Sequence, residues 1–133
     1  MPTKPIAIEG FQYTLTPADA GGLAQLQVVL NPVLHTKVND AKPIVADTTF
    51  SLSNYMDGSA IDVPSSGATT SPFKFTPTIQ HDTIEGSLVI VNQDQVTVTV
   101  SGLKKVEGGG TTPVSLPVTI QITDAGQQFV KAQ

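Results

Sequence analysis

The sequence contains no cysteine, no arginine and no tryptophan. The lack of cysteine excludes disulfides, thiolate nucleophiles and metal sites built on thiolates. The seven basic residues are all lysines, they are scattered along the chain, and the formal net charge is −4. Proteins that bind nucleic acids or anionic membranes use clustered cations, and arginine in particular reads guanine edges. We therefore expect no nucleic-acid partner and no attraction to an anionic membrane.

Long apolar runs are also missing. A run such as Leu88–Val91 is far shorter than the roughly 20 residues of a membrane-spanning helix, so no membrane anchoring is expected. The N-terminal residues 1–5, MPTKP, are not followed by the apolar stretch of a Sec signal. These features predict synthesis in the cytoplasm, with any export by another route.

The residues that are abundant favour β structure. Threonine and valine are the most frequent residue types, and both suit a pleated, half-buried backbone. Ten prolines and eleven glycines interrupt the chain at intervals of about one strand. A length of 133 residues fits one domain with its own core. The sequence predicts an all-β fold: a single compact domain, residues 1–133, of antiparallel strands and hairpins, sandwich-like or pyramid-like.

Alternation of apolar and polar residues places the strands. The first alternating stretch, 6–15, is broken at Gly10, which predicts a bend or bulge. Further strands are expected at 23–30, at 50–52, at 87–91, and as a hairpin formed by 33–38 and 42–46. The clearest pair is 96–100 with 114–122, a long hairpin with its tip at about 104–113. The stretch 64–72, PSSGATTSP, predicts a flexible loop.

Catalytic and metal-binding patterns are poorly represented. The two histidines, His35 and His81, are the only candidate metal ligands of their kind, with an aspartate such as Asp47, Asp82 or Asp94 as a further donor. Neither histidine belongs to a ligand-spaced pair. His81-Asp82 has two residue types of a catalytic triad, but neighbours on a strand point to opposite faces. We expect no enzyme, no cofactor and no bound metal.

Two weaker binding patterns remain open. Carbohydrate-binding β-modules stack sugar rings on aromatic side chains, and Tyr13 and Tyr55 are the tyrosines available for that role. The stretch Asn92-Gln93-Asp94 has the composition of part of a calcium loop, and also that of a turn between two strands. We favour the turn because the spaced acidic series of a calcium loop is missing.

The segment 38–48, VNDAKPIVADT, carries the most specific pattern in the chain. It resembles the repeated hairpin of PAAR and PAAR-like proteins, in which an apolar residue, a tight turn, Lys-Pro, alternating residues and an aspartate follow one another. The matching residues are Asn39, Asp40, Lys42, Pro43 and Asp47. Asn39 tolerates a left-handed backbone, and Pro43 sets the direction of the returning strand. Asp40-Ala41 predicts a three-residue turn, and Asp47 is expected to accept hydrogen bonds in the next turn.

The resemblance implies a small β-pyramid on the end of a trimeric spike, as in contractile phage tails and related injection machines. On that basis we expect a non-enzymatic structural component of a phage-like or contractile injection particle, assembled into a virion or secreted particle. Its partner would be a larger assembly, such as a trimeric spike or a capsid. A capsid decoration or tail accessory protein, and a carbohydrate-binding β-module, are the alternative interpretations.

Overall fold

The computed structural model describes residues 3–29, 35–63, 69–78, 80 and 82–132. All regular elements in these residues are β-strands, so the prediction of an all-β fold is confirmed. The strands are β1 (Lys4–Pro5), β2 (Gln12–Thr16), β3 (Gln25–Val29), β4 (Thr49–Ser53), β5 (Thr83–Ile84), β6 (Ser87–Leu88), β7 (Gln95–Lys105), β8 (Thr111–Asp124) and β9 (Lys131–Ala132).

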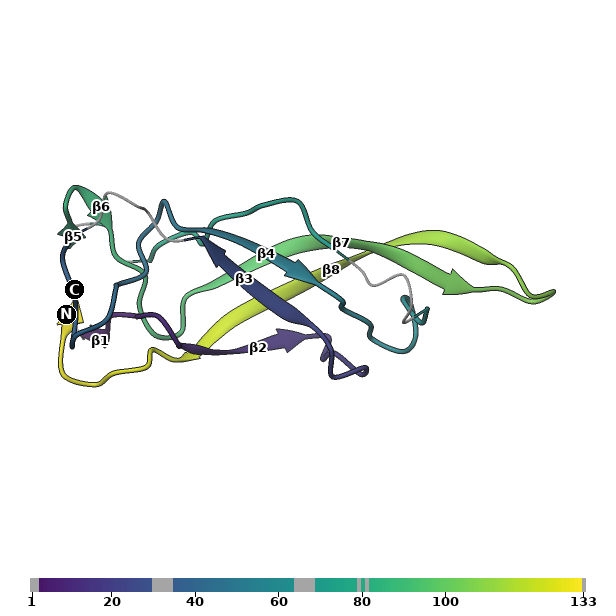
Figure 1. Cartoon of the computed structure of the whole chain (residues 1–133), viewed down its shortest axis with the longest axis horizontal. Coiled ribbons are helices and arrows are strands. Elements are labelled where there is room, and N and C mark those ends of the chain that lie inside the picture. The colour runs from purple at the N-terminus through teal and green to yellow at the C-terminus, as the bar shows by residue number, and fades with distance from the viewer. Residues whose placement is uncertain (1–2, 30–34, 64–68, 79, 81, 133) are drawn as a thin grey trace.

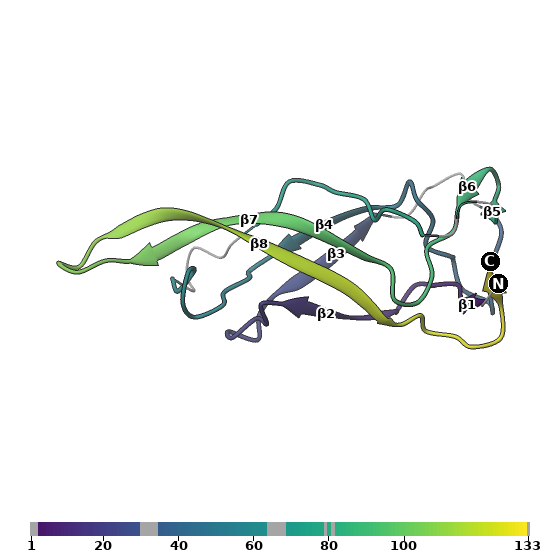
Figure 2. The ribbon, with the colours of Figure 1, turned by 180° about the vertical axis from the view of Figure 1, so that it is seen from behind.

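The molecule is elongated (Figure 1). Both ends of the chain lie at one end of it with β1, β5 and β6, and the β7–β8 hairpin reaches far beyond the other strands at the opposite end, as the reverse view also shows (Figure 2). The predicted long hairpin is confirmed, with pairing from Gln95↔Gln121 to Lys105↔Thr111. The two strands extend into the predicted tip and leave residues 106–110 to connect them.

The larger strands surround the core as an incomplete barrel. One sheet has the order β2–β8–β7, and β3 pairs with β4 in a second. Residues 69–73 join these sheets, because Thr69 exchanges hydrogen bonds with Ser101 of β7 and Phe73 with Phe50 of β4. Of the loop predicted at 64–72, residues 64–68 lie outside the described residues. Among the described residues no ladder joins β2 to β3, so the barrel is open along that line.

Aromatic rings fill the centre of the barrel. Phe50 is 1% exposed and contacts three other phenylalanines: Phe11 and Phe75 edge-on, with centroids 6.2 and 4.9 Å away, and Phe73 in a stacked arrangement at 5.9 Å. Alternating residues of the strands complete this core; they include Leu52, Val100, Val118, Ile120 and Ile122. Burial of these side chains is the main stabilising contribution to the fold.

Three segments of equal length, 5–16, 42–53 and 88–99, have the same structure. Their sequences are PIAIEGFQYTLT, KPIVADTTFSLS and LVIVNQDQVTVT. Each begins with an extended stretch, makes a tight turn, and continues into a strand, which is β2, β4 or β7. The chain therefore contains an internal threefold repeat.

The three segments are joined to one another in a closed ring of main-chain hydrogen bonds. The Ala7 N–H donates to the Ile90 carbonyl (2.9 Å), the Ile44 N–H to the Ala7 carbonyl (2.8 Å), and the Ile90 N–H to the Ile44 carbonyl (3.0 Å). A second set joins the same segments in the opposite sense, from the N–H groups of Glu9, Ala46 and Asn92 to the carbonyls of Lys42, Leu88 and Pro5 (3.0, 2.8 and 2.9 Å). We call residues 6–9, 43–46 and 89–92 the ring.

A tight turn follows the ring in each segment. Thr48 N–H donates to the Val45 carbonyl (3.0 Å), Asp94 N–H to that of Val91 (3.1 Å), and Phe11 N–H to that of Ile8 (3.1 Å). In two of the turns a side chain also accepts a hydrogen bond: Thr48 Oγ1 accepts the Val45 N–H, and an Asp94 carboxylate oxygen accepts the Val91 N–H. The stretch 92–94 is thus a turn, as favoured from the sequence.

Candidate functional site

Beyond the ring, three similar elements form what we call the threefold end: the turn 38–41, the β5–β6 hairpin, and the β1–β9 pair. The residues Val38, Ile84 and Ala132 occupy corresponding places, opposite Ala41, Ser87 and Lys4. All three belong to one small apolar cluster under this end. The two chain ends therefore lie where the third hairpin would have its turn.

The turn predicted from the PAAR-like segment is present, but it is shorter than expected. Val38 and Ala41 exchange both main-chain hydrogen bonds (2.8 and 3.0 Å), so Asn39 and Asp40 are the only residues between them. Both have positive φ angles, 51° and 65°, which is the geometry of a type I′ turn. The prediction of a three-residue turn was wrong, because Asp40 adopts the left-handed backbone and Ala41 already pairs with Val38.

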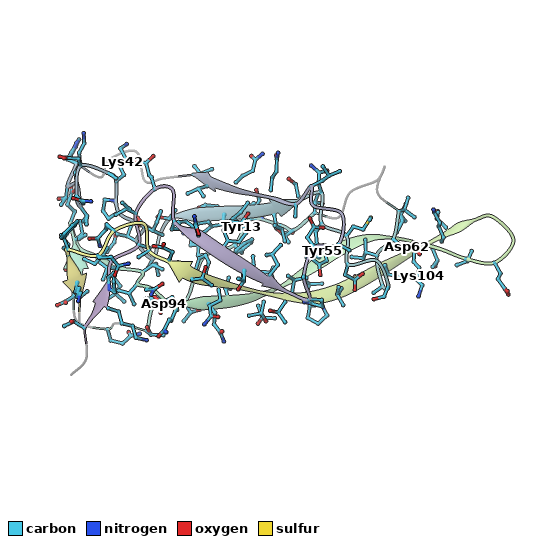
Figure 3. All side chains as sticks on the ribbon, turned by 90° about the horizontal axis from the view of Figure 1, so that it is seen from below. Tyr13, Lys42, Tyr55, Asp62, Asp94 and Lys104 are labelled. Carbon is cyan, nitrogen blue, oxygen red and sulfur yellow. The ribbon has the colours of Figure 1, made fainter. Side chains whose placement is uncertain are left out.

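Lys42 and Pro43 enter the ring rather than a simple hairpin. Pro43 is buried and bridges Ile8, while Val45 bridges Val89, so the predicted pairing of 42–46 with 33–38 is wrong beyond the turn; residues 33 and 34 lie outside the described residues. The Lys42 N–H donates to Glu9 Oε1 (3.2 Å), and its carbonyl accepts the Glu9 N–H. Lys42 lies at the threefold end in Figure 3.

Asp47 lies in the turn that follows the ring, and its carboxylate is exposed. The side chain that accepts the Val45 N–H in this turn is that of Thr48. The corresponding acceptor in the third segment, Asp94, is 1% exposed. It also accepts a hydrogen bond from the Thr78 hydroxyl. Sequence reasoning missed Thr48 and Asp94 as a pair, although aligning 42–53 with 88–99 puts them at the same position.

The histidines are not brought together as a metal site by the described structure. His35 is exposed, and its main-chain N–H donates to the Glu85 carboxylate (2.6 Å), as does that of Thr36 (2.7 Å). Mainly the hydrogen bond from Thr36 lowers the pKa of Glu85, since it stabilises the charged carboxylate. His81 lies outside the described residues. Within those residues, no group of three or more histidine or acidic side chains could hold a metal ion.

At the far end of the barrel, Asp19 and Tyr55 hold two loops together. The Asp19 carboxylate accepts N–H groups of Gly21, Ala24 and Met56 (3.3, 2.9 and 3.0 Å). The Tyr55 hydroxyl donates to the Pro17 carbonyl (2.7 Å), and its side chain is fully buried. Tyr55 therefore cannot stack on a sugar ring. Tyr13, half-buried, is the tyrosine that lines a surface groove.

Alkaline pH should lower the free energy of unfolding, because the buried Tyr55 hydroxyl resists ionisation in the folded state. Burial, followed by the nearby carboxylates of Asp57 and Asp19, raises its pKa from 10.0 to about 12. A raised pKa means that the folded state favours the neutral phenol. The stabilisation is therefore complete below pH 10 and is lost as the pH rises toward 12. In urea titrations between pH 8 and 12, Tyr55→Phe should show a smaller alkaline loss of stability.

At neutral pH the same variant should cost about 1 kcal/mol, because the hydrogen bond to the Pro17 carbonyl is lost. Tyr13→Phe is the matched control, since the Tyr13 hydroxyl takes no part in this contact. An alkaline loss in Tyr55→Phe as large as in the wild-type protein would contradict the assignment.

Two cavities lie along the open line between β2 and β3. The larger, about 390 Å³, is a shallow groove lined by Tyr13, Thr14, Leu15, Ala18, Asp19, Gly22 and Ala24. The smaller, about 170 Å³, is more enclosed and is lined by Glu9, Gly10, Phe11, Val28 and Ile44. The threefold end and this groove are thus the candidate functional surfaces of the described residues.

Comparison of the chain with protein-family models, with curated proteins and with solved structures found no match. Among the described residues, no helix has the length and apolar character needed to cross a membrane. The function must therefore be argued from the geometry of the molecule itself.

Proposed function

We propose that this protein is a non-enzymatic structural component of a phage-like or contractile injection particle, and that its threefold end docks on the end of a trimeric spike. The observation that carries the proposal is the closed ring formed by Ala7, Ile44 and Ile90. The PAAR-like segment contributes one third of that ring and the turn next to it.

Symmetry is the physical reason for the choice of partner. The end of a trimer offers the same surface three times, and an ordinary single chain could use only one of the three. This chain presents three similar elements around one axis, namely the 38–41 turn, the β5–β6 hairpin and the β1–β9 pair. Each can meet one subunit of a trimer. The opposite end lacks this symmetry, because the β7–β8 hairpin extends there alone (Figure 1).

The chemistry of the threefold end suits contact with a protein. Its turns carry polar and acidic side chains at Asn39, Asp40 and Glu85, all exposed. Phe129, next to β9, is 83% exposed. Exposed aromatic rings are typical anchors of protein–protein interfaces.

The test is binding to any trimeric spike protein that is encoded beside this chain. Size-exclusion chromatography with light scattering should show one copy of the chain per three spike chains, with saturable binding in calorimetry. Phe129→Asp should weaken the affinity at least about tenfold, by placing a charge in the contact. Val106→Asp, at the remote hairpin tip and 42% exposed, is the control and should bind as wild type.

A stoichiometry of three chains per spike trimer would contradict the proposal, since each copy would then use one subunit. Equal losses of affinity in Phe129→Asp and Val106→Asp would also contradict it, because Phe129 directly precedes β9 and Val106 directly follows β7, and these parts of the strands lie at opposite ends of the molecule.

A further inference from the structure

In the part of the chain that the structure describes, the barrel is open at a seam between β2 and β3. Going around the barrel, β3 pairs with β4, β4 with residues 70–73, Thr69 with β7, β7 with β8, and β8 with β2. In Figure 1 the two strands diverge from the loop that connects them. In the other two repeats the outgoing strand pairs with the segment that returns after it, β7 with β8 and β4 with residues 70–73. In the first repeat these strands are β2 and β3, and that pairing is missing among the described residues.

Both walls of the seam present unpaired main-chain groups. The Ile122 main chain bonds to Gln93 and Asp94, on the side away from β2. Its partner Tyr13 is therefore in a non-hydrogen-bonded pair with it, and the N–H and C=O of Tyr13 and Leu15 point into the seam. On the other wall, the Phe50 main chain bonds to Phe73, on the side of β4 away from β3. Val28, which lies opposite Phe50 on β3, therefore has its N–H and C=O directed away from β4 and into the seam.

Another free edge of the same sheet is blocked, whereas the seam is not. β8 continues past the end of β2. In that part, the residues whose main-chain groups point away from β7 include Pro113 and Pro117, which have no N–H to offer a further strand. Pro113 faces outward because its partner Leu103 bonds to Asp62 on the other side. Edges exposed to water are often protected by proline in this way. The corresponding positions at the seam, Tyr13 and Leu15 on β2, are not proline.

The seam is also hollow and has an apolar floor. The two cavities, about 390 and 170 Å³, lie at its two ends. Tyr13, Leu15 and Leu26 are half-buried there and pack against the main core. A five-residue strand with apolar side chains at alternate positions could cover this floor while its main chain pairs with both walls.

We propose that an extended strand of another protein inserts between β2 and β3 and completes the barrel. The occupant would alternate polar and apolar residues, as β2 and β4 do, and would carry no proline at positions that pair with the walls. A second copy of this chain is disfavoured, because its long hairpin offers a proline-blocked edge on β8, and on β7 Lys105 N–H already bonds to Asp62 (2.7 Å). The seam is separate from the threefold end, so this proposal does not depend on spike docking.

The experiment starts from a displayed library of random heptapeptides, selected on the full chain. A selected peptide should protect the amides of Tyr13, Leu15, Leu26 and Val28 from hydrogen exchange at least about tenfold when it saturates the protein. Amides already paired between β7 and β8 should change little. The same peptide, N-methylated at alternate residues so that it cannot donate hydrogen bonds to one of the two walls, should bind at least about tenfold more weakly.

A matched pair of variants tests the wall itself. Val28→Pro removes a main-chain N–H that faces the seam but leaves the ladder to β4 intact, and Val28→Thr keeps both the N–H and the shape of the side chain. Affinity should fall at least about tenfold in Val28→Pro and stay unchanged in Val28→Thr. The proposal is overturned if no peptide protects the seam amides, or if the N-methylated peptide binds as well as its parent. The peptide result stands even if Val28→Pro does not fold.

Discussion

Truncation of Phe50 to alanine should lower the free energy of unfolding by about 3–5 kcal/mol, the usual range for a buried phenylalanine. The ring is 1% exposed and lies between Phe11, Phe73 and Phe75. Its removal leaves a cavity that three other rings border. The ladder to β3 on one side and the hydrogen bonds to Thr70 and Phe73 on the other prevent β4 from closing the space. Urea unfolding followed by circular dichroism measures the loss.

Phe129→Ala is the matched control because it makes the same chemical change at a site that is 83% exposed. Its effect on stability should lie within about 0.5 kcal/mol. Similar losses for the two variants would mean that Phe50 does not occupy the centre of the core. Since small domains are stable by only about 5–15 kcal/mol, Phe50→Ala should also lower the melting temperature strongly.

Replacement of Asp94 by alanine should cost about 2–3 kcal/mol. Its carboxylate accepts the Val91 N–H (3.0 Å) and the Thr78 hydroxyl, and both Asp94 and Val91 are almost completely buried. Without the carboxylate, the Val91 N–H has no partner inside the protein, and an unsatisfied buried donor costs about 1–3 kcal/mol. Hydrogen bonds to a charged group are at the stronger end of the range.

Thr48→Ala is the natural comparison, since Thr48 occupies the same position in the second repeat and accepts only the Val45 N–H through its side-chain oxygen (3.2 Å). Its cost should be smaller, about 1 kcal/mol. Asp94→Asn, which keeps one acceptor oxygen, should fall between the two. The equivalence of the two turns would be contradicted if Asp94→Ala were neutral while Thr48→Ala was destabilising. Unfolding in urea at neutral pH provides all three values.

The proposed docking and the proposed strand insertion make different demands on the molecule. Docking needs the symmetric arrangement of three elements and is tested at Phe129. Strand insertion needs one asymmetric feature, the missing β2–β3 pairing, and is tested at Val28. Failure of one leaves the other intact, because the two surfaces share none of these residues.

The fold class and most strand positions follow from the amino-acid sequence alone. Alternation of valine and threonine at 96–100 and of apolar residues at 114–122 places the long hairpin correctly, because strong alternation on both sides of one connection favours pairing of the two strands. The break at Gly10 also lies at a real turn, where φ is +85°. The lack of cysteine, arginine and tryptophan excludes whole classes of site, because the chemistry of those sites depends on the missing side chains.

The partners of the short segments, by contrast, depend on the tertiary structure. Residues 42–46 form no hairpin with the chain before them, because their main chain bonds to residues 7–9 and 88–90, which lie far away in the sequence. Local propensity carries no information about such contacts, so the ring, the threefold end and the open seam could not be predicted from strand patterns. The threefold repeat is present in the sequence at 5–16, 42–53 and 88–99, but few positions carry the same residue in all three segments. What the repeats share is the hydrogen bonding of their main chains, and that is visible only in three dimensions.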